Sequence, residues 1–188
     1  MENELSKTEL ERKKLVEMSR SDFDDMMVKR FPSIFADRNK PMTVTCMCWG
    51  FDVGPGWHPL LLDLCIKISA ICRMSGAVVV ADQVKEKYGT LRFYYHVSLG
   101  NSRTSSFFKR VFGLFRKTPY LQKDRIVIID DIIRDVVNQA ESASAATCEV
   151  CGQYGQVRSV CGWYSSLCEQ HAEAKKNKAT PCAAQEPS

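Results

Sequence analysis

A short stretch near the C-terminal end of the sequence carries two pairs of residues with the spacing of metal ligands. Cys148 and Cys151 are separated by two residues, and Cys168 and His171 repeat that spacing. Three thiolates and one imidazole complete the tetrahedral coordination typical of structural zinc and leave no open position for water or substrate. The spacing therefore predicts a closed structural Zn²⁺ site with a module folded around it.

The residues between and after the two pairs predict a treble-clef-like zinc finger. Gly152 permits the positive φ that turns backbone N–H groups toward the sulfurs of a zinc knuckle. Residues 156–160 and 163–167 have the composition of short strands, and residues 168–178 that of a helix. Cys161 lies outside both pairs, and two roles stay open for it: a substitute ligand, or a bystander thiol at the turn between the strands.

The composition is that of an ordinary globular chain. Its 188 residues suffice for one core of domain size, and 45% of them are hydrophobic. The longest apolar run, 60–81, is broken by charged residues, and the N-terminal end is densely charged, so we expect neither a membrane span nor a secretory signal. We expect a cytoplasmic protein whose nine cysteines are reduced. The net charge of +4 is too small to require a nucleic-acid partner.

Outside the finger, helical patterns alternate with strand patterns. Helices are predicted at three places: 6–30, 57–74 and from Asp130 onward. Strands are predicted at 43–51 and, as a hairpin around Gly89, at 77–88 and 90–97. A small antiparallel sheet (hairpin 77–97) packed on helices, with the zinc finger appended, is an α+β architecture.

We divide the chain into four parts on this basis. They are an N-terminal helical segment at 1–30, an α+β core at 31–146 with an insertion at about 98–123, the zinc finger at 147–174, and a disordered tail at 175–188.

Four stretches combine aromatic, glycine, basic and cysteine residues in an unusual way. They are CWGF at 48–51, QVKEKYGTLRFY at 83–94, CEVCG at 148–152 and WYSSLCEQHA at 163–172. In these stretches the chain resembles a family of small uncharacterised proteins of bacteriophages and prophages, over most of residues 31–173. The resemblance implies a phage accessory protein and no particular reaction. Between Ser98 and Lys123 the chain departs from the shorter family pattern.

The predicted hairpin is the best candidate for a ligand-binding surface. Side chains alternate along a strand, so Lys85 and Lys87 share one face, and Arg92 and Tyr94 share one face across the turn. If these faces coincide, the resulting basic and aromatic surface suits phosphate and a nucleobase. The candidate ligand-binding residues are Lys85, Lys87, Arg92, Tyr94, Trp49 and Trp57. The alternative is an ordinary solvated sheet face with the core on the other side.

The insertion contains a pattern typical of a basic amphipathic helix. Its candidate partner-binding residues are Phe108, Phe112 and Phe115 on one side, and Arg110 and Arg116 on the other. Three roles stay open: docking on the protein's own core or on a second copy, insertion into a groove of a host protein, and contact with an anionic membrane. The membrane is the least favoured, because one short segment binds membranes only weakly and reversibly.

The sequence contains no recognisable catalytic motif. Residues 54–56 form a glycine-containing turn too short to cradle phosphate, with a proline where a backbone N–H would be needed. We therefore expect a non-enzymatic, zinc-stabilised protein that binds an anionic ligand, either a nucleotide or a nucleic acid. The resemblance implies, in a phage context, interference with host defence, for instance by sequestering a nucleotide signal. The alternatives are an inhibitor that binds a host protein and a nucleic-acid-binding regulator.

Overall fold

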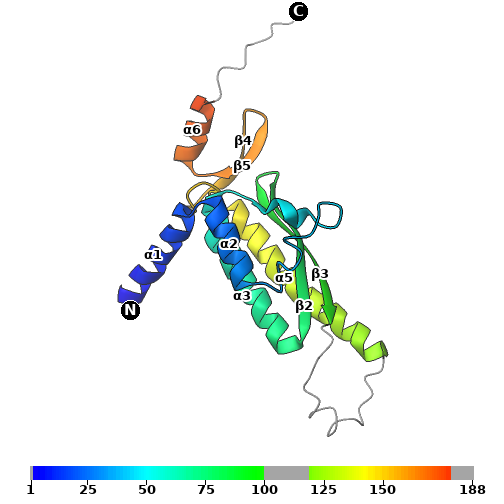
Figure 1. The fold of residues 1–188 in the computed structure, drawn as a ribbon. Coiled ribbons are helices and arrows are strands. Elements are labelled where there is room, and N and C mark those ends of the chain that lie inside the picture. The colour runs from blue at the N-terminus through cyan, green and yellow to red at the C-terminus, as the bar shows by residue number, and fades with distance from the viewer. Residues whose placement is uncertain (1, 100–118, 179–188) are drawn as a thin grey trace, which may run out of the picture.

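The computed structural model describes residues 2–99 and 119–178 (Figure 1). Its elements are α1 (Glu2–Glu17), α2 (Arg20–Arg30), the 3₁₀ turn η1 (Cys46–Trp49), β1 (Phe51–Asp52), η2 (Pro55–Trp57), α3 (His58–Ser75), β2 (Ala77–Lys87), β3 (Thr90–Leu99), α5 (Pro119–Ala145), β4 (Gln156–Val160), β5 (Trp163–Leu167) and α6 (Glu169–Lys178). Helices and two small sheets make an α+β fold, as predicted. Figure 1 shows β4, β5 and α6 beyond the tip of the β2–β3 hairpin.

The larger sheet consists of the predicted hairpin and one additional short strand. Its strand order is β1-β2-β3, with β1 parallel to β2 and β2 antiparallel to β3. Lys85 lies directly opposite Arg92, and the register shifts between Ala81 and Gln83, as at a β-bulge. The sheet is therefore mixed, whereas the sequence predicted an antiparallel one.

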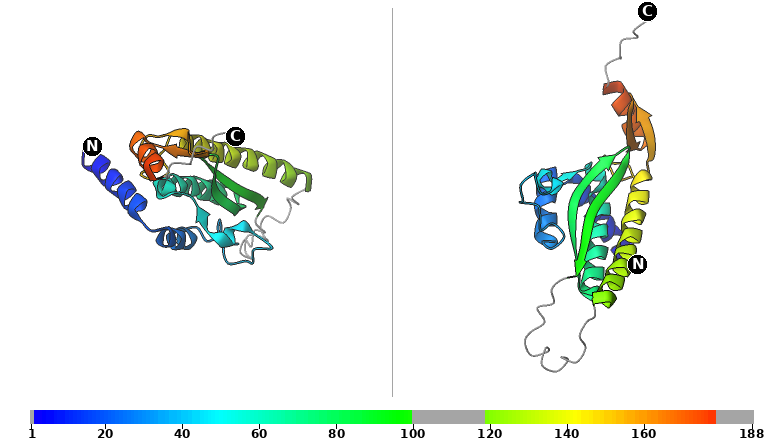
Figure 2. Two further views of the ribbon diagram at one scale, coloured as in Figure 1. Left: turned by 90° about the horizontal axis from the view of Figure 1, so that it is seen from above. Right: turned by 90° about the vertical axis from the view of Figure 1, so that its right-hand side faces the viewer.

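One face of the hairpin forms the main core. Val84, Leu91 and Phe93 are buried on this face, in agreement with the alternation in the sequence. Their core cluster includes Leu64 and Ile68 of α3 and Ile133 of α5. Figure 2 shows α3 and α5 running along the same side of the hairpin. Burial of each large apolar side chain contributes about 1.5–3 kcal/mol, so this layer holds the hairpin in place.

Helix α5 also covers the outer edge of β3. The backbone N–H of Leu91 donates to Ser144 Oγ at 2.8 Å, and that of Phe93 donates to Glu141 Oε1 at 3.0 Å. Unpaired N–H groups on an edge strand invite pairing with another chain. Two side chains of α5 satisfy such groups here, so this part of the edge is closed.

The strand predicted at 43–51 is wrong for most of its length. Residues Cys46–Trp49 form the 3₁₀ turn η1, and only Phe51–Asp52 are extended as β1. Thr45 caps the turn by accepting the backbone N–H of Met47, and Gly50 leaves it with φ 75°. A hydroxyl cap and a glycine with positive φ favour a turn over a strand, despite the apolar residues between them.

Two helix boundaries also differ from the prediction. The helix predicted at 6–30 is two helices, because the Ser19 side chain accepts the backbone N–H of Asp22 and begins α2 as its N-cap. Helix α5 begins at Pro119, well before Asp130, and proline is favoured in the first turn of a helix. Residues 119–129, which precede Asp130, are therefore already helical.

Two polar side chains are buried where α1, α2 and α3 meet. Asp24 Oδ2 of α2 accepts a hydrogen bond from Arg38 Nη2 at 3.1 Å, and Asp24 Oδ1 accepts one from the backbone N–H of Phe51 at 3.2 Å. His58 of α3 stacks on Phe23 with ring centroids 3.8 Å apart, and its Nδ1–H donates to the Leu15 carbonyl at 2.8 Å. This hydrogen bond ties the end of α1 to the start of α3.

The burial of His58 makes stability depend on pH. Burial lowers the His58 pKa, although the Leu15 carbonyl and Asp24 act in the opposite direction. The folded state therefore binds this proton less well than the unfolded state, and the free energy of unfolding decreases as pH falls below about 6.5, until the folded-state pKa is passed. Each unit of difference between the two pKa values contributes about 1.4 kcal/mol.

Chemical denaturation of wild type and His58→Gln at pH 7.5 and 5.5 tests this prediction. The loss of stability on acidification should be smaller in the variant than in wild type. Equal losses in the two proteins would show that His58 does not titrate as its burial requires.

Within the described ranges, the helices include none with both the length and the apolar character of a membrane-spanning segment.

Candidate metal centre and ligand-binding surface

The four predicted ligands meet at one point. One ligand atom from each of Cys148, Cys151, Cys168 and His171 lies within 4.8 Å of the other three. His171 Nδ1 is 3.6 Å from the Cys148 sulfur and 3.0 Å from the Cys168 sulfur, and the Cys151 and Cys168 sulfurs are 3.9 Å apart. Ligand atoms of a tetrahedral zinc are about 3.5–3.8 Å apart. The arrangement is therefore that of a metal site.

The local backbone explains how the first pair of ligands converges. Gly152 has φ 72°, as predicted for a knuckle, and its N–H donates to the Cys148 carbonyl at 2.9 Å. Burial raises the pKa of the Cys148 thiol, but backbone N–H groups of residues 168, 151 and 150 bind its sulfur and bring the pKa below its ordinary value. The knuckle thus favours thiolate, the form that binds metal, at Cys148, whereas burial raises the pKa of Cys151 to about 11.

The rest of the finger also follows the sequence closely. Strands β4 and β5 have the predicted bounds, and His171 lies in the first turn of α6. Cys161 occupies the turn between the strands with φ 52°, is exposed, and is not among the clustered ligands, so of its two open roles it is the bystander. Helix α6 continues through Lys178, so residues 175–178 are helical and do not belong to a disordered tail.

The turn at residues 54–56 attaches the finger to the core. The backbone N–H of Gly56 donates to the Glu149 carbonyl at 2.8 Å. A Cβ at Gly54 would lie 2.2 Å from the Glu149 carbonyl oxygen, and one at Gly56 would lie 2.1 Å from the Cys148 carbonyl oxygen. Only glycine allows the two backbones to approach this closely. The turn therefore docks the knuckle and does not hold a phosphate.

Trp57, proposed from the sequence as a ligand-binding residue, is instead part of this junction. Its side chain is 0% exposed, and its Nε1–H donates to the Thr147 carbonyl at 2.8 Å. A ring with no exposed surface cannot stack on a ligand, so this assignment is wrong. The indole joins the start of α3 to the end of α5 beside the finger.

The other hairpin candidates do share one outer face. Lys85 lies opposite Arg92, and the Lys85 ammonium is 5.8 Å from the centre of the Tyr94 ring. Lys87 lies two residues further along β2, with its ammonium 5.5 Å from the Tyr88 ring. Among the described residues, neither lysine lies within ion-pair distance of a carboxylate. Both charges are therefore open to a ligand.

Arg92 is held more firmly than the two lysines. Its Nη1 donates to Thr90 Oγ1 and to the Leu91 carbonyl, both at 2.7 Å, and lies 3.6 Å from a Glu141 carboxylate oxygen. The guanidinium therefore has a fixed position, and part of its charge is offset. Arg92 can orient an anion, whereas Lys85 and Lys87 supply most of the net charge.

Trp49 lies at the end of this face nearest β1. Its side chain is 65% exposed and lines a cavity of about 360 Å³ together with Arg20 and Gln83. Gln83 is paired with Tyr94 across the hairpin, so the indole borders the surface that Lys85 and Tyr94 form. The proposed partner-binding residues of the insertion, Phe108, Phe112, Phe115, Arg110 and Arg116, lie outside the described residues.

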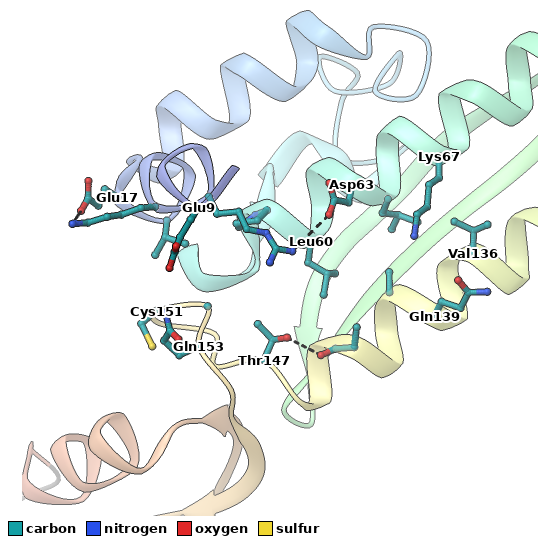
Figure 3. A pocket seen from close by; sticks show the side chains of 18 residues that line it. Glu9, Glu17, Leu60, Asp63, Lys67, Val136, Gln139, Thr147, Cys151 and Gln153 are labelled. Atoms are coloured by element: carbon teal, nitrogen blue, oxygen red, sulfur yellow. Dashed lines mark hydrogen bonds and ion pairs between the residues drawn. The ribbon is translucent and has the colours of Figure 1, made fainter. Parts of the chain in front are cut away.

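A second and larger cavity lies on the other side of the core (Figure 3). It has a volume of about 730 Å³ and is bounded by α1, α3, α5 and residues 151–153 of the knuckle. Its apolar walls include Leu60 and Val136, and its rim carries three acidic and three basic side chains: Glu9, Glu17, Asp63, Arg12, Lys13 and Lys67. The sequence could not predict it, because four distant segments assemble it.

Comparison with known proteins adds no assignment. The chain matches no protein-family model, none of the curated proteins and none of the solved structures against which it was compared.

Proposed function

We propose that this protein is a non-enzymatic binding protein, stabilised by zinc at Cys148, Cys151, Cys168 and His171, which captures an anionic ligand on the outer face of β2–β3. The observation that carries the proposal is the pair of cations Lys85 and Lys87, which have no carboxylate partner among the described residues and each lie beside an exposed tyrosine ring. The ligand carries phosphate and a nucleobase, because the lysines attract the first and the rings stack on the second.

The arrangement of charge on this face supports binding and gives no support to catalysis. Arg92 sits opposite Lys85 with a fixed guanidinium, so a phosphate between them would receive two charge-assisted hydrogen bonds. The ordinary alternative is a solvated sheet face, on which lysines usually pair with carboxylates or extend into water. In a phage context, such capture would serve to remove a nucleotide or nucleic-acid signal of host defence.

Charge reversal of the two lysines tests the proposal. We expect Lys85→Glu/Lys87→Glu to lower the affinity at least ten-fold, because each charge-assisted hydrogen bond contributes about 1.5–3 kcal/mol and the new charges repel phosphate. The probes are fluorescein-labelled octathymidylate and a fluorescent adenosine triphosphate analogue, measured by anisotropy.

The matched control is Lys14→Glu/Lys29→Glu, which changes the net charge equally on exposed positions of α1 and α2. This control should bind as wild type, and both variants should remain folded; the melting temperature of the control should fall by a few degrees at most, because Lys14 and Lys29 lie in the last turns of α1 and α2. If wild type binds neither probe, or if both variants lose affinity equally, the proposed function is wrong.

A further inference from the structure

The exposed aromatic rings near the finger extend the outer face of the hairpin. Tyr88, at the tip of β2–β3, is 69% exposed, and Tyr164 of β5 is 55% exposed. Exposed apolar side chains that gather on one surface mark interaction sites, whereas single exposed rings are ordinary. Trp163 and Tyr154 of the finger are also exposed, at 75% and 73%. Trp163 lies on the face of β4–β5 opposite to that of Tyr164, so Tyr88 and Tyr164 are distinguished by their position and not by their exposure.

The tip of the hairpin lies against the finger, so the rings belong to neighbouring surfaces. A Cβ at Gly89 would lie 2.8 Å from the Val157 side chain of β4 and 3.2 Å from the Ser165 backbone nitrogen of β5. In the β4–β5 ladder, Val157 is opposite Ser166 and Ser159 is opposite Tyr164. Because side chains alternate, Val157 and Tyr164 share the face of this ladder that Gly89 approaches.

The tip itself is built so that the ring of Tyr88 stays exposed. Tyr88 and Gly89 have φ 54° and 79°, the two positive values of a type I′ turn. Asparagine is the favoured residue at the first of these positions, and a bulky aromatic residue there is uncommon. The turn therefore places a ring where backbone preference alone would place a small polar residue.

Lys85 and Lys87 lie along the same path on the hairpin surface as Tyr94 and Tyr88. From the Gln83–Tyr94 pair to the Lys87–Thr90 pair, the hairpin extends four residues, or about 13 Å. Lys85 and Lys87 lie along this length, and beyond it come Tyr88 and then β4–β5. Asp52 of β1 is the acidic neighbour of Lys85. Its negative charge is offset by Arg20, whose Nη1 lies 3.4 Å from Asp52 Oδ1. The path is thus basic and aromatic over more than the length of one nucleotide.

We infer that the ligand is a single-stranded nucleic acid, which runs from Tyr94 along the outer face of β2–β3, over Tyr88, to Tyr164 on the finger. This inference rests on the proposed function and adds the class of ligand and its path. Alternating cations and exposed rings bind a strand whose bases are unstacked, because the cations follow its phosphates and each ring stacks on one base. A duplex hides its base faces from such rings.

Chain length of the probe is the first test. Octathymidylate should bind at least ten-fold more tightly than dithymidylate, because only the longer strand reaches the finger. Three cations on the path predict a slope of about −2 for the logarithm of the octathymidylate binding constant against the logarithm of salt concentration. Both are measured by fluorescence anisotropy on the full chain with its metal content confirmed.

Removal of the two distal rings is the second test. Tyr164→Ser should weaken octathymidylate binding about ten-fold and leave dithymidylate binding unchanged, and Tyr88→Asn, which suits the type I′ turn, should also weaken octathymidylate binding about ten-fold. The matched control is Ile128→Ser, which removes an exposed apolar side chain from α5 and should have no effect on either probe.

The outcomes separate the inference from the function on which it rests. Equal affinity for the two probes, with no effect of Tyr164→Ser, would overturn the extended path and leave capture of a single nucleotide at the hairpin. Absence of binding to both thymidylates would overturn the extended path, and absence of binding to the adenosine triphosphate analogue as well would overturn the proposed function itself.

Discussion

Cys148→Ser is expected to abolish metal binding and to unfold the finger, residues 147–178. The buried core of this module is only Cys148, Val160, Leu167 and Ala172. So small a core cannot maintain a fold without help, whereas a structural zinc contributes about 10–16 kcal/mol of apparent binding free energy in small modules. The loss should be seen as zero bound zinc by elemental analysis and as rapid amide exchange throughout β4, β5 and α6.

Cys161→Ser is the matched control for this change. It replaces a cysteine of the same module by the same residue, but at an exposed turn away from the clustered ligands. One zinc per chain and wild-type amide protection are expected. A folded, zinc-loaded Cys148→Ser protein, or loss of zinc in Cys161→Ser, would contradict the assigned ligands.

Trp57→Ala is expected to lower the free energy of unfolding by about 3–5 kcal/mol, the usual loss for a large buried aromatic residue. Trp57 is fully buried in the main core, and its Nε1–H binds the Thr147 carbonyl one residue before the first metal ligand. The change should therefore destabilise the core and loosen the attachment of the finger together. Denaturant unfolding measures the first effect, and amide exchange of Thr147 and Cys148 measures the second.

Trp57→Phe separates packing from the hydrogen bond. The ring keeps much of the buried volume but removes the donor, so the loss should be smaller, about 1–3 kcal/mol, with the faster exchange near Thr147 retained. If Trp57→Ala were as stable as wild type and bound octathymidylate less well, the indole would belong to the ligand surface after all.

Local patterns made the finger and the hairpin predictable. Two ligand pairs with fixed spacing specify a metal site almost regardless of context, and Gly152 marks the knuckle by its backbone conformation. The hairpin follows from strict alternation around Gly89, which also identified Val84 and Leu91 as core residues. The hairpin pattern lies within neighbouring residues of the chain. The metal site is predictable because paired cysteine and histidine residues at this spacing usually bind metal.

The remaining features depend on contacts between distant segments. Trp57 has the same local sequence whether its ring faces water or the core, and only the approach of Thr147 decides between them. The glycines of the 54–56 turn equally fit a loop, until the knuckle is seen to lie against them. The three-stranded sheet and the 730 Å³ cavity likewise arise from packing that spacing along the chain does not record.

The most direct measurement is a native mass spectrum of the full chain with octathymidylate, recorded for wild type and for Lys85→Glu/Lys87→Glu. We predict one zinc per chain in both proteins and a one-to-one oligonucleotide adduct that is strong in wild type and nearly absent in the variant. Equal adducts in the two proteins, or zinc-loaded wild type with no adduct of octathymidylate or of any added nucleotide, would contradict capture on the outer face of β2–β3.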